Sequence, residues 1–125
     1  MTAIQNILMV MGGSALGGGA RYLLSMLIQQ FNRSPFPAGT FIVNLLGCFL
    51  IGMLYAAHIR NPETGPGLKL LLATGFCGGF TTFSAFAVEN LSLFREGNFG
   101  VSLAYAGSSL ILGIAAAWAG SVIMK

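Results

Sequence analysis

Four long apolar stretches constrain this chain more than any other feature. They cover residues 4–31, 40–59, 68–94 and 101–124, and short polar connections separate them. A helix needs about 20 consecutive apolar residues to cross a bilayer, and in lipid only helices and closed barrels satisfy the backbone hydrogen bonds. Only 7% of the residues are charged, against about 25% in a typical soluble domain. The sequence therefore predicts an all-α membrane protein with four transmembrane helices in a single domain, residues 1–125.

The few polar and charged side chains exclude several classes of function. The formal net charge of +3 comes from nine charged residues and not from a basic patch, so nucleic-acid binding has no support. The chain contains no Ser-His-Asp set, no cluster of metal-ligating residues and no paired carboxylates, which argues against an enzyme. Cys48 and Cys77 both lie in apolar stretches, where we expect small buried thiols and not a disulfide.

The third apolar stretch is interrupted near its middle by the glycine-rich segment Gly75 to Phe86. Each glycine costs a helix roughly 1 kcal/mol relative to alanine and frees the backbone to turn. We therefore expect the third helix to be broken near the bilayer midplane. Unwound backbone is tolerated at that depth only where it is buried in protein or lines a cavity, so the break predicts a pore or a binding site.

Glycines are also frequent in the first stretch. Gly13 and Gly17 are four residues apart, a small-xxx-small pattern that allows helix backbones to approach closely in lipid. We interpret this pattern as a packing face.

The basic residues divide evenly between the two sides of the membrane. Because successive spans alternate in direction, the arginines and lysines fall into two groups of three: Arg60, Lys69 and Lys125 on one side, and Arg33, Arg95 and a snorkelling Arg21 on the other. The positive-inside rule then favours neither orientation. This balance would allow insertion in both directions and association of two inverted copies, in which the two breaks would meet.

Polar side chains recur at helical spacing in the second and fourth stretches. Thr40 and Asn44 are four residues apart, as are Tyr105 and Ser109, with Ser108 beside them. Residues four apart lie on one helical face, so these side chains suit a pathway for a small polar solute. Each also has a simpler explanation, because Asn44 could form an interhelical hydrogen bond and the serines could bond to their own preceding turn.

Two aromatic residues and one acidic residue follow the break. Phe83 and Phe86 are three apart and would project in similar directions, with ring edges that carry partial positive charge and can face an anion. Glu89 is the only carboxylate well inside an apolar stretch, which makes it a functional candidate. It could instead be solvated or pair with Asn90 or Arg95.

Taken together, these motifs resemble the signature of the Fluc (CrcB-type) family of fluoride ion channels. The resemblance covers the whole chain, through Gly12-Gly13 to Arg21, Gly39-Thr40, Val43-Asn44-Leu45 and Gly75 to Ser84. One departure is Ala85, where the family pattern has a threonine between the two phenylalanines.

The resemblance implies an antiparallel (dual-topology) homodimer with two fluoride pores. It assigns Gly78 and Thr81 as the residues whose backbone carbonyls hold a structural sodium ion at the dimer centre, and Arg21 as a vestibule residue. The fluoride pore is assigned to Thr40, Asn44, Thr82, Phe83, Phe86, Tyr105, Ser108 and Ser109.

The implied function is passive, selective export of fluoride from the cytoplasm across the bacterial plasma (inner) membrane, which lowers fluoride toxicity. The main alternative is a small proton-coupled multidrug transporter, which also has four spans and can insert in both directions. That mechanism requires an acidic residue deep in the first span, and this span has none. An accessory packing subunit would explain the glycines but would leave the polar residues and the break unexplained.

Overall fold

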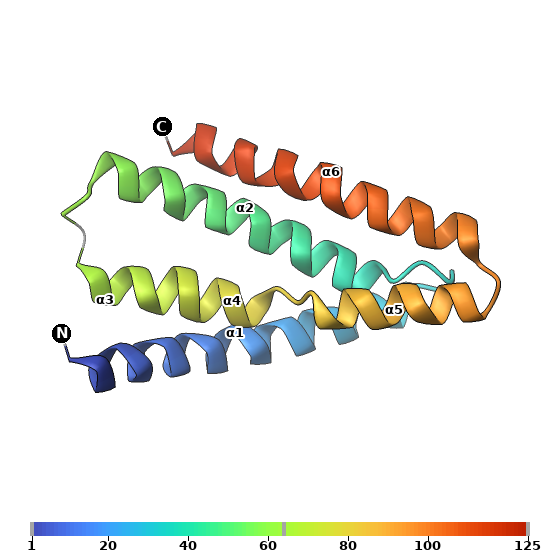
Figure 1. Cartoon of the computed structure of the whole chain (residues 1–125), viewed down its shortest axis with the longest axis horizontal. Coiled ribbons are helices and arrows are strands. Elements are labelled where there is room, and N and C mark those ends of the chain that lie inside the picture. The colour runs from blue at the N-terminus through green and yellow to red at the C-terminus, as the bar shows by residue number, and fades with distance from the viewer. Residues whose placement is uncertain (1, 64, 125) are drawn as a thin grey trace.

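The computed structural model describes residues 2–63 and 65–124 and is all-helical. Four helices are long and apolar enough to cross a membrane, Ala3–Phe31, Ala38–Arg60, Pro66–Arg95 and Phe99–Ile123, and their ends lie within two residues of those expected. They comprise α1 (Ala3–Phe31), α2 (Ala38–Arg60), a third span in pieces, and α6 (Phe99–Ile123). The prediction of four spanning helices with the third one bent is confirmed (Figure 1).

The third span consists of four pieces: α3 (Pro66–Lys69), a π-helical segment η1 (Leu70–Cys77), α4 (Gly78–Phe80) and α5 (Ser84–Arg95). The N-terminus, the α2–α3 connection and the C-terminal end of α6 lie at one end of the bundle, and the other two connections lie at the opposite end (Figure 1). Arg60 and Lys69 therefore lie at one end, while Arg33 and Arg95 lie at the other. Lys125 falls outside the described residues.

Glycines bring α1 and the third span into backbone contact. A Cβ at Gly17 would lie 2.1 Å from the Phe76 carbonyl oxygen, and a Cβ at Gly13 would lie 2.2 Å from that of Leu71. Both distances are far below van der Waals contact, so only glycine fits at these positions. The small-xxx-small interpretation of this pair is confirmed.

The break itself lies later than the glycines suggested. Gly75, Gly78 and Gly79 are all helical, and the chain leaves helical geometry at residues 81–83, beginning with Thr81 at φ −88° and ψ 156°. The break therefore lies within the predicted segment Gly75 to Phe86, but at its threonines and not at its glycines. Gly75 and Gly79 pack against α1, where a Cβ at Gly79 would lie 2.6 Å from the Ser14 carbonyl oxygen, whereas a Cβ at Gly78 would meet nothing within 4 Å.

A second close seam joins α2 to α6. A Cβ at Gly52 would lie 2.0 Å from the Ala117 carbonyl oxygen, and one at Gly120 would lie 2.1 Å from that of Phe49. The chain thus packs as two tight pairs, α1 with the first half of the third span and α2 with α6. Val43, Ser102 and Tyr105 are fully buried where α2 and α6 meet the second half of the third span.

Candidate functional site

A groove of about 720 Å³ lies between α2, the third span and α6. Its walls include small and apolar residues such as Gly47, Cys48 and Ile51 from α2, and no charged side chain is among its lining residues. Cys48 and Cys77, the latter from the third span, are both free thiols that line the groove. The groove brings together seven of the residues predicted for the pore or the cation site: Asn44, Gly78, Thr81, Thr82, Phe83, Phe86 and Ser109.

Asn44 bonds directly to the backbone of the break. Its Nδ2 donates to the Thr82 carbonyl at 3.0 Å, and its Oδ1 accepts the Thr82 N–H at 2.8 Å. One side-chain amide thus takes the place of both backbone hydrogen bonds that Thr82 would form in an intact helix. The interhelical hydrogen bond left open for Asn44 is present, and the residue lines the groove as well.

Two backbone carbonyls lose their usual donors at the break. In an unbroken helix the amides of Thr82 and Ala85 would donate to the carbonyls of Gly78 and Thr81. Here the Thr82 amide bonds to Asn44, and the Ala85 amide bonds to the Thr82 hydroxyl at 3.3 Å. The Thr81 hydroxyl donates to the Cys77 carbonyl at 2.9 Å.

The donor set around these carbonyls fits a hard cation. Gly78 is exposed and lines the groove. Hard cations such as sodium are held by oxygen ligands, backbone carbonyls among them. Among the described residues no group of three histidine, cysteine, aspartate or glutamate side chains could hold a metal ion. The oxygens that line this groove are those of the backbone and of amide and hydroxyl side chains.

Two side chains of α1 bond to the part of the third span that precedes the break. Arg21 Nε donates to the Gly79 carbonyl at 3.2 Å, and Ser14 Oγ donates to the Gly75 carbonyl at 3.3 Å. A cation is favourable near the carbonyl end of a helix. Arg21 therefore contacts the third span, whereas the sequence predicted that it would snorkel to the membrane surface. It is not among the groove residues.

Glu89 accepts hydrogen bonds from two predicted pore residues. Thr40 Oγ1 donates to Oε2 and the Tyr105 hydroxyl donates to Oε1, each at 2.9 Å. Thr40 and Tyr105 are both buried, and neither lines the groove. Of the alternatives left open for Glu89, the pairing with Asn90 is not seen: the Asn90 side chain donates to the Phe86 carbonyl and accepts from Ser102.

Aromatic rings connect the groove to this carboxylate cluster. The centroids of Phe83 and Phe86 are 5.7 Å apart with the planes tilted by 38°, and Phe86 lies 5.0 Å from Tyr105. Phe36, from the α1–α2 loop, extends the row at 5.3 Å from Tyr105. Phe83 is 78% exposed, so one end of the row lies at the open surface of the groove. The row then passes through the buried Tyr105 to the half-buried Phe36.

The two predicted serines behave differently. Ser108 Oγ donates to the Ala104 carbonyl, one turn back on its own helix, which is the simpler explanation considered above. Ser109 Oγ is buried and, within residues 2–63 and 65–124, has no hydrogen-bond partner. Ser109 lines the groove, and its hydroxyl is a buried group whose hydrogen is not used by another described residue.

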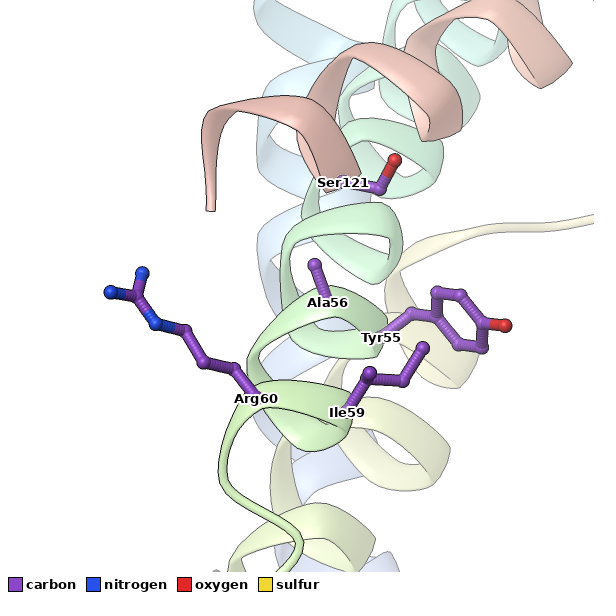
Figure 2. A pocket seen from close by; sticks show the side chains of 5 residues that line it. All are labelled: Tyr55, Ala56, Ile59, Arg60 and Ser121. Atoms are coloured by element: carbon purple, nitrogen blue, oxygen red, sulfur yellow. The ribbon is translucent and has the colours of Figure 1, made fainter. Parts of the chain in front are cut away.

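A second cavity, of about 400 Å³, lies at the end of the bundle that carries the C-terminus of α2. Figure 2 shows its lining side chains, with the Arg60 guanidinium pointing away from Tyr55 and Ile59. Arg60 also makes a long hydrogen bond to the Met124 carbonyl, and Ser121 bonds to Trp118 on its own helix. The polar groups do not converge, and none of the predicted site residues lines this cavity.

The chain resembles known proteins along nearly its whole length. The family model described as "CrcB-like protein, Camphor Resistance (CrcB)" matches residues 8–121. The chain belongs to the CrcB family. The CrcB match includes all four spans, the break and every predicted site residue.

Several CrcB relatives carry the name "Fluoride-specific ion channel FluC". The protein of Methylobacillus flagellatus is 42% identical over 123 residues, which cover 98% of this chain and 96% of that protein. The protein of Leptospira interrogans is 41% identical over 125 residues, covering 100% and 98% respectively. That of Azobacteroides pseudotrichonymphae is 39% identical over 122 residues, covering 98% of each.

Sequence reasoning missed some parts of the site in this CrcB chain. Ser14, which bonds the π-helical segment, was not selected because serine in a glycine-rich helix signals packing. Gly47 and Cys48 line the groove, and their spacing of three and four residues after Asn44 was the available signal.

Proposed function

We infer that this chain is a fluoride-specific ion channel and not an enzyme, and that it lets fluoride cross the membrane passively. The observation that carries this conclusion is the full-length similarity, 39% to 42% identity, to proteins named as fluoride-specific channels. Four membrane-spanning helices supply the multi-pass scaffold that such a channel requires. We propose that the channel exports fluoride from the cytoplasm across the bacterial plasma membrane and so lowers its toxicity.

The proposed pathway begins at the groove and runs along the aromatic rings. Fluoride holds its water tightly, so a pore must replace the hydration shell with donors and then release the ion. The groove offers the hydroxyls of Thr82 and Ser109, the amide of Asn44 and the edges of Phe83 and Phe86. None of its lining residues is charged, and a row of moderate donors suits conduction better than one strong cationic site would.

Beyond the rings, the pathway would reach the cluster around Glu89. Thr40 and Tyr105 hold this carboxylate by two hydrogen bonds, and Tyr105 adjoins Phe86. Both hydroxyls already donate their single hydrogen to Glu89, so in this proposal Thr40 and Tyr105 line the inner end of the pore through this cluster. Ser108 and Ser109 line the pore from α6, and Arg21 belongs to a vestibule beside α1.

The proposed assembly is an antiparallel, dual-topology homodimer with two pores and one sodium ion. The groove is open along the surface where Phe83 is exposed, so a second copy is needed to close it. The even distribution of basic residues permits inverted insertion. Carbonyls of Gly78 and Thr81 from two inverted copies would supply four oxygen ligands for sodium at the centre.

The proton-coupled multidrug transporter is the weaker alternative. Residues 3–31 contain no aspartate or glutamate, so α1 has no proton carrier. The intramembrane carboxylate is Glu89, which lies in the third span and is held by two hydroxyls. CrcB family membership favours the channel.

The decisive experiment measures ion efflux from liposomes that contain the purified protein. We expect rapid fluoride release and chloride retention; equal release of both ions, or no release of fluoride, would refute the function. An epitope at the C-terminus should be detected on both membrane faces in cells. Detection on one face only would refute the inverted dimer while leaving the channel activity in place.

A further inference from the structure

We propose that Asn44 and Thr82 are positioning residues that keep the third span broken and thereby keep the Gly78 and Thr81 carbonyls available to a cation. The inference rests on the cation site of the proposed function and adds a second role for two residues assigned to the fluoride pore. Its basis is the redirection of two backbone amides, from the carbonyls they would reach in a helix to two side chains.

Nothing in the local chain forces the break. The last proline before it is Pro66, fifteen residues upstream of Thr81, and none occurs within the break or in α5. Among the described residues no non-glycine has a positive φ, and the positive-φ glycine is Gly97, far from the break. Residues 81–83 could therefore continue as helix, which in lipid would satisfy the Gly78 and Thr81 carbonyls. The broken form needs compensation from outside the span.

Asn44 supplies most of that compensation. A primary amide presents a donor and an acceptor side by side, which matches the N–H and C=O of one residue. Aspartate would place two acceptors against the Thr82 carbonyl, and leucine would offer neither group. The Thr82 hydroxyl then accepts the Ala85 amide and so starts α5 in the manner of a helix cap.

Close packing holds this arrangement in place. A Cβ at Gly47, one turn after Asn44, would lie 2.1 Å from Thr81 Cγ2, so α2 lies directly against the break. α2 is in turn joined to α6 by the glycine seam at Gly52 and Gly120. The Asn44 amide therefore reaches Thr82 from a helix that is fixed by its packing against α6. If residues 81–83 became helical, α2 could not easily move with them.

The consequence is a coupling between the fluoride path and the cation site. Asn44 lines the groove and controls the geometry of Gly78 without being a cation ligand. Loss of the Asn44 amide should therefore weaken sodium binding as well as fluoride passage.

The test compares Asn44→Leu and Thr82→Val with Thr82→Ser, which keeps the hydroxyl, and with Gly107→Ala, a control on α6 where a Cβ would meet nothing within 4 Å. The first readout is amide hydrogen exchange at Thr82 and Ala85 in the full-length protein, in sodium and in sodium-free buffer. Asn44→Leu should raise exchange at Thr82 by about tenfold or more, the factor that corresponds to one lost hydrogen bond. Thr82→Val should do the same at Ala85, while Thr82→Ser and Gly107→Ala should not.

The second readout is the shift in melting temperature on adding sodium. Wild type, Thr82→Ser and Gly107→Ala should shift, whereas Asn44→Leu and Thr82→Val should not. Unchanged exchange at Thr82 in Asn44→Leu, or a wild-type sodium shift in that variant, would overturn the proposal. If Asn44→Leu does not fold, the Thr82→Val and Thr82→Ser pair decides in the same way. Fluoride efflux measured in parallel separates the two hypotheses, because wild type that conducts fluoride without responding to sodium would refute only the cation site and this coupling.

Discussion

Replacing Gly17 by alanine tests the backbone seam between α1 and the third span. A Cβ at this position would lie 2.1 Å from the Phe76 carbonyl oxygen and 2.9 Å from the Phe80 nitrogen. Ordinary van der Waals contact begins at 3.4 Å, so the gap must widen by about 1.3 Å. Both opposing atoms belong to the main chain, and no change of side-chain rotamer can relieve the clash.

The adjacent Gly18 provides a matched control, because a Cβ there would meet nothing within 4 Å. Overpacking of a tight interior costs about 1–3 kcal/mol, and we expect Gly17→Ala near the upper limit since two backbones must separate. Gly18→Ala should instead gain up to about 1 kcal/mol, the difference in helix propensity. Because the propensity gain applies to both variants, they should differ by the clash alone, about 3 kcal/mol.

The assay is equilibrium unfolding in detergent micelles, with fluoride efflux measured on the same preparations. Efflux should fall in Gly17→Ala, because α1 also carries the Arg21 and Ser14 hydrogen bonds to the Gly79 and Gly75 carbonyls. Equal stability of the two variants would refute the packing argument. A destabilised Gly17→Ala with normal efflux would show that the seam does not position the break.

Three further predictions concern the groove and its inner cluster. Phe83→Ile should reduce fluoride efflux while leaving the oligomeric state unchanged on size-exclusion chromatography, and unaltered flux would remove Phe83 from the pathway. Ser109→Ala should lower efflux yet keep or raise the melting temperature, because a buried unpaired hydroxyl costs about 1–3 kcal/mol; Ser108→Ala, whose bond is local, should change neither, and equal effects of the two would contradict the distinction. Glu89→Gln should cost about 1.5–3 kcal/mol in unfolding free energy, since the amide nitrogen cannot accept from Thr40 or Tyr105. Thr40→Ser keeps the donor and should stay near wild type, whereas a fully stable Glu89→Gln would refute the role of the carboxylate.

Hydropathy alone was sufficient to locate the spans, because a chain in lipid must satisfy its own backbone and a helix does so locally. The packing face at Gly13 and Gly17 could also be predicted from the sequence, because residues without a side chain are what allow two helix backbones to approach closely. Helical spacing placed Thr40 and Asn44 on one face, and the structure shows that both side chains of this face bond to the third span, at Glu89 and Thr82.

The position of the break and the partners of Glu89 required the tertiary structure. The low helix propensity of glycine indicated Gly75, Gly78 and Gly79 as the point where the third span would break. Gly75 and Gly79 are nevertheless helical and in contact with α1. The helix opens instead at Thr81, next to the residue that Asn44 binds from 38 positions away. Glu89 likewise pairs with Thr40, 49 positions away, and not with its neighbours.

The sequence by itself determined that this chain crosses the membrane four times, that its third helix is interrupted near the middle, and which residue types are available to an ion. These properties depend on hydropathy and local spacing. Only the tertiary structure decided which backbone groups the break releases. An acceptor on another helix, Asn44 Oδ1, takes the Thr82 amide from the hydrogen bonds of its own helix, and local sequence does not show where that acceptor lies.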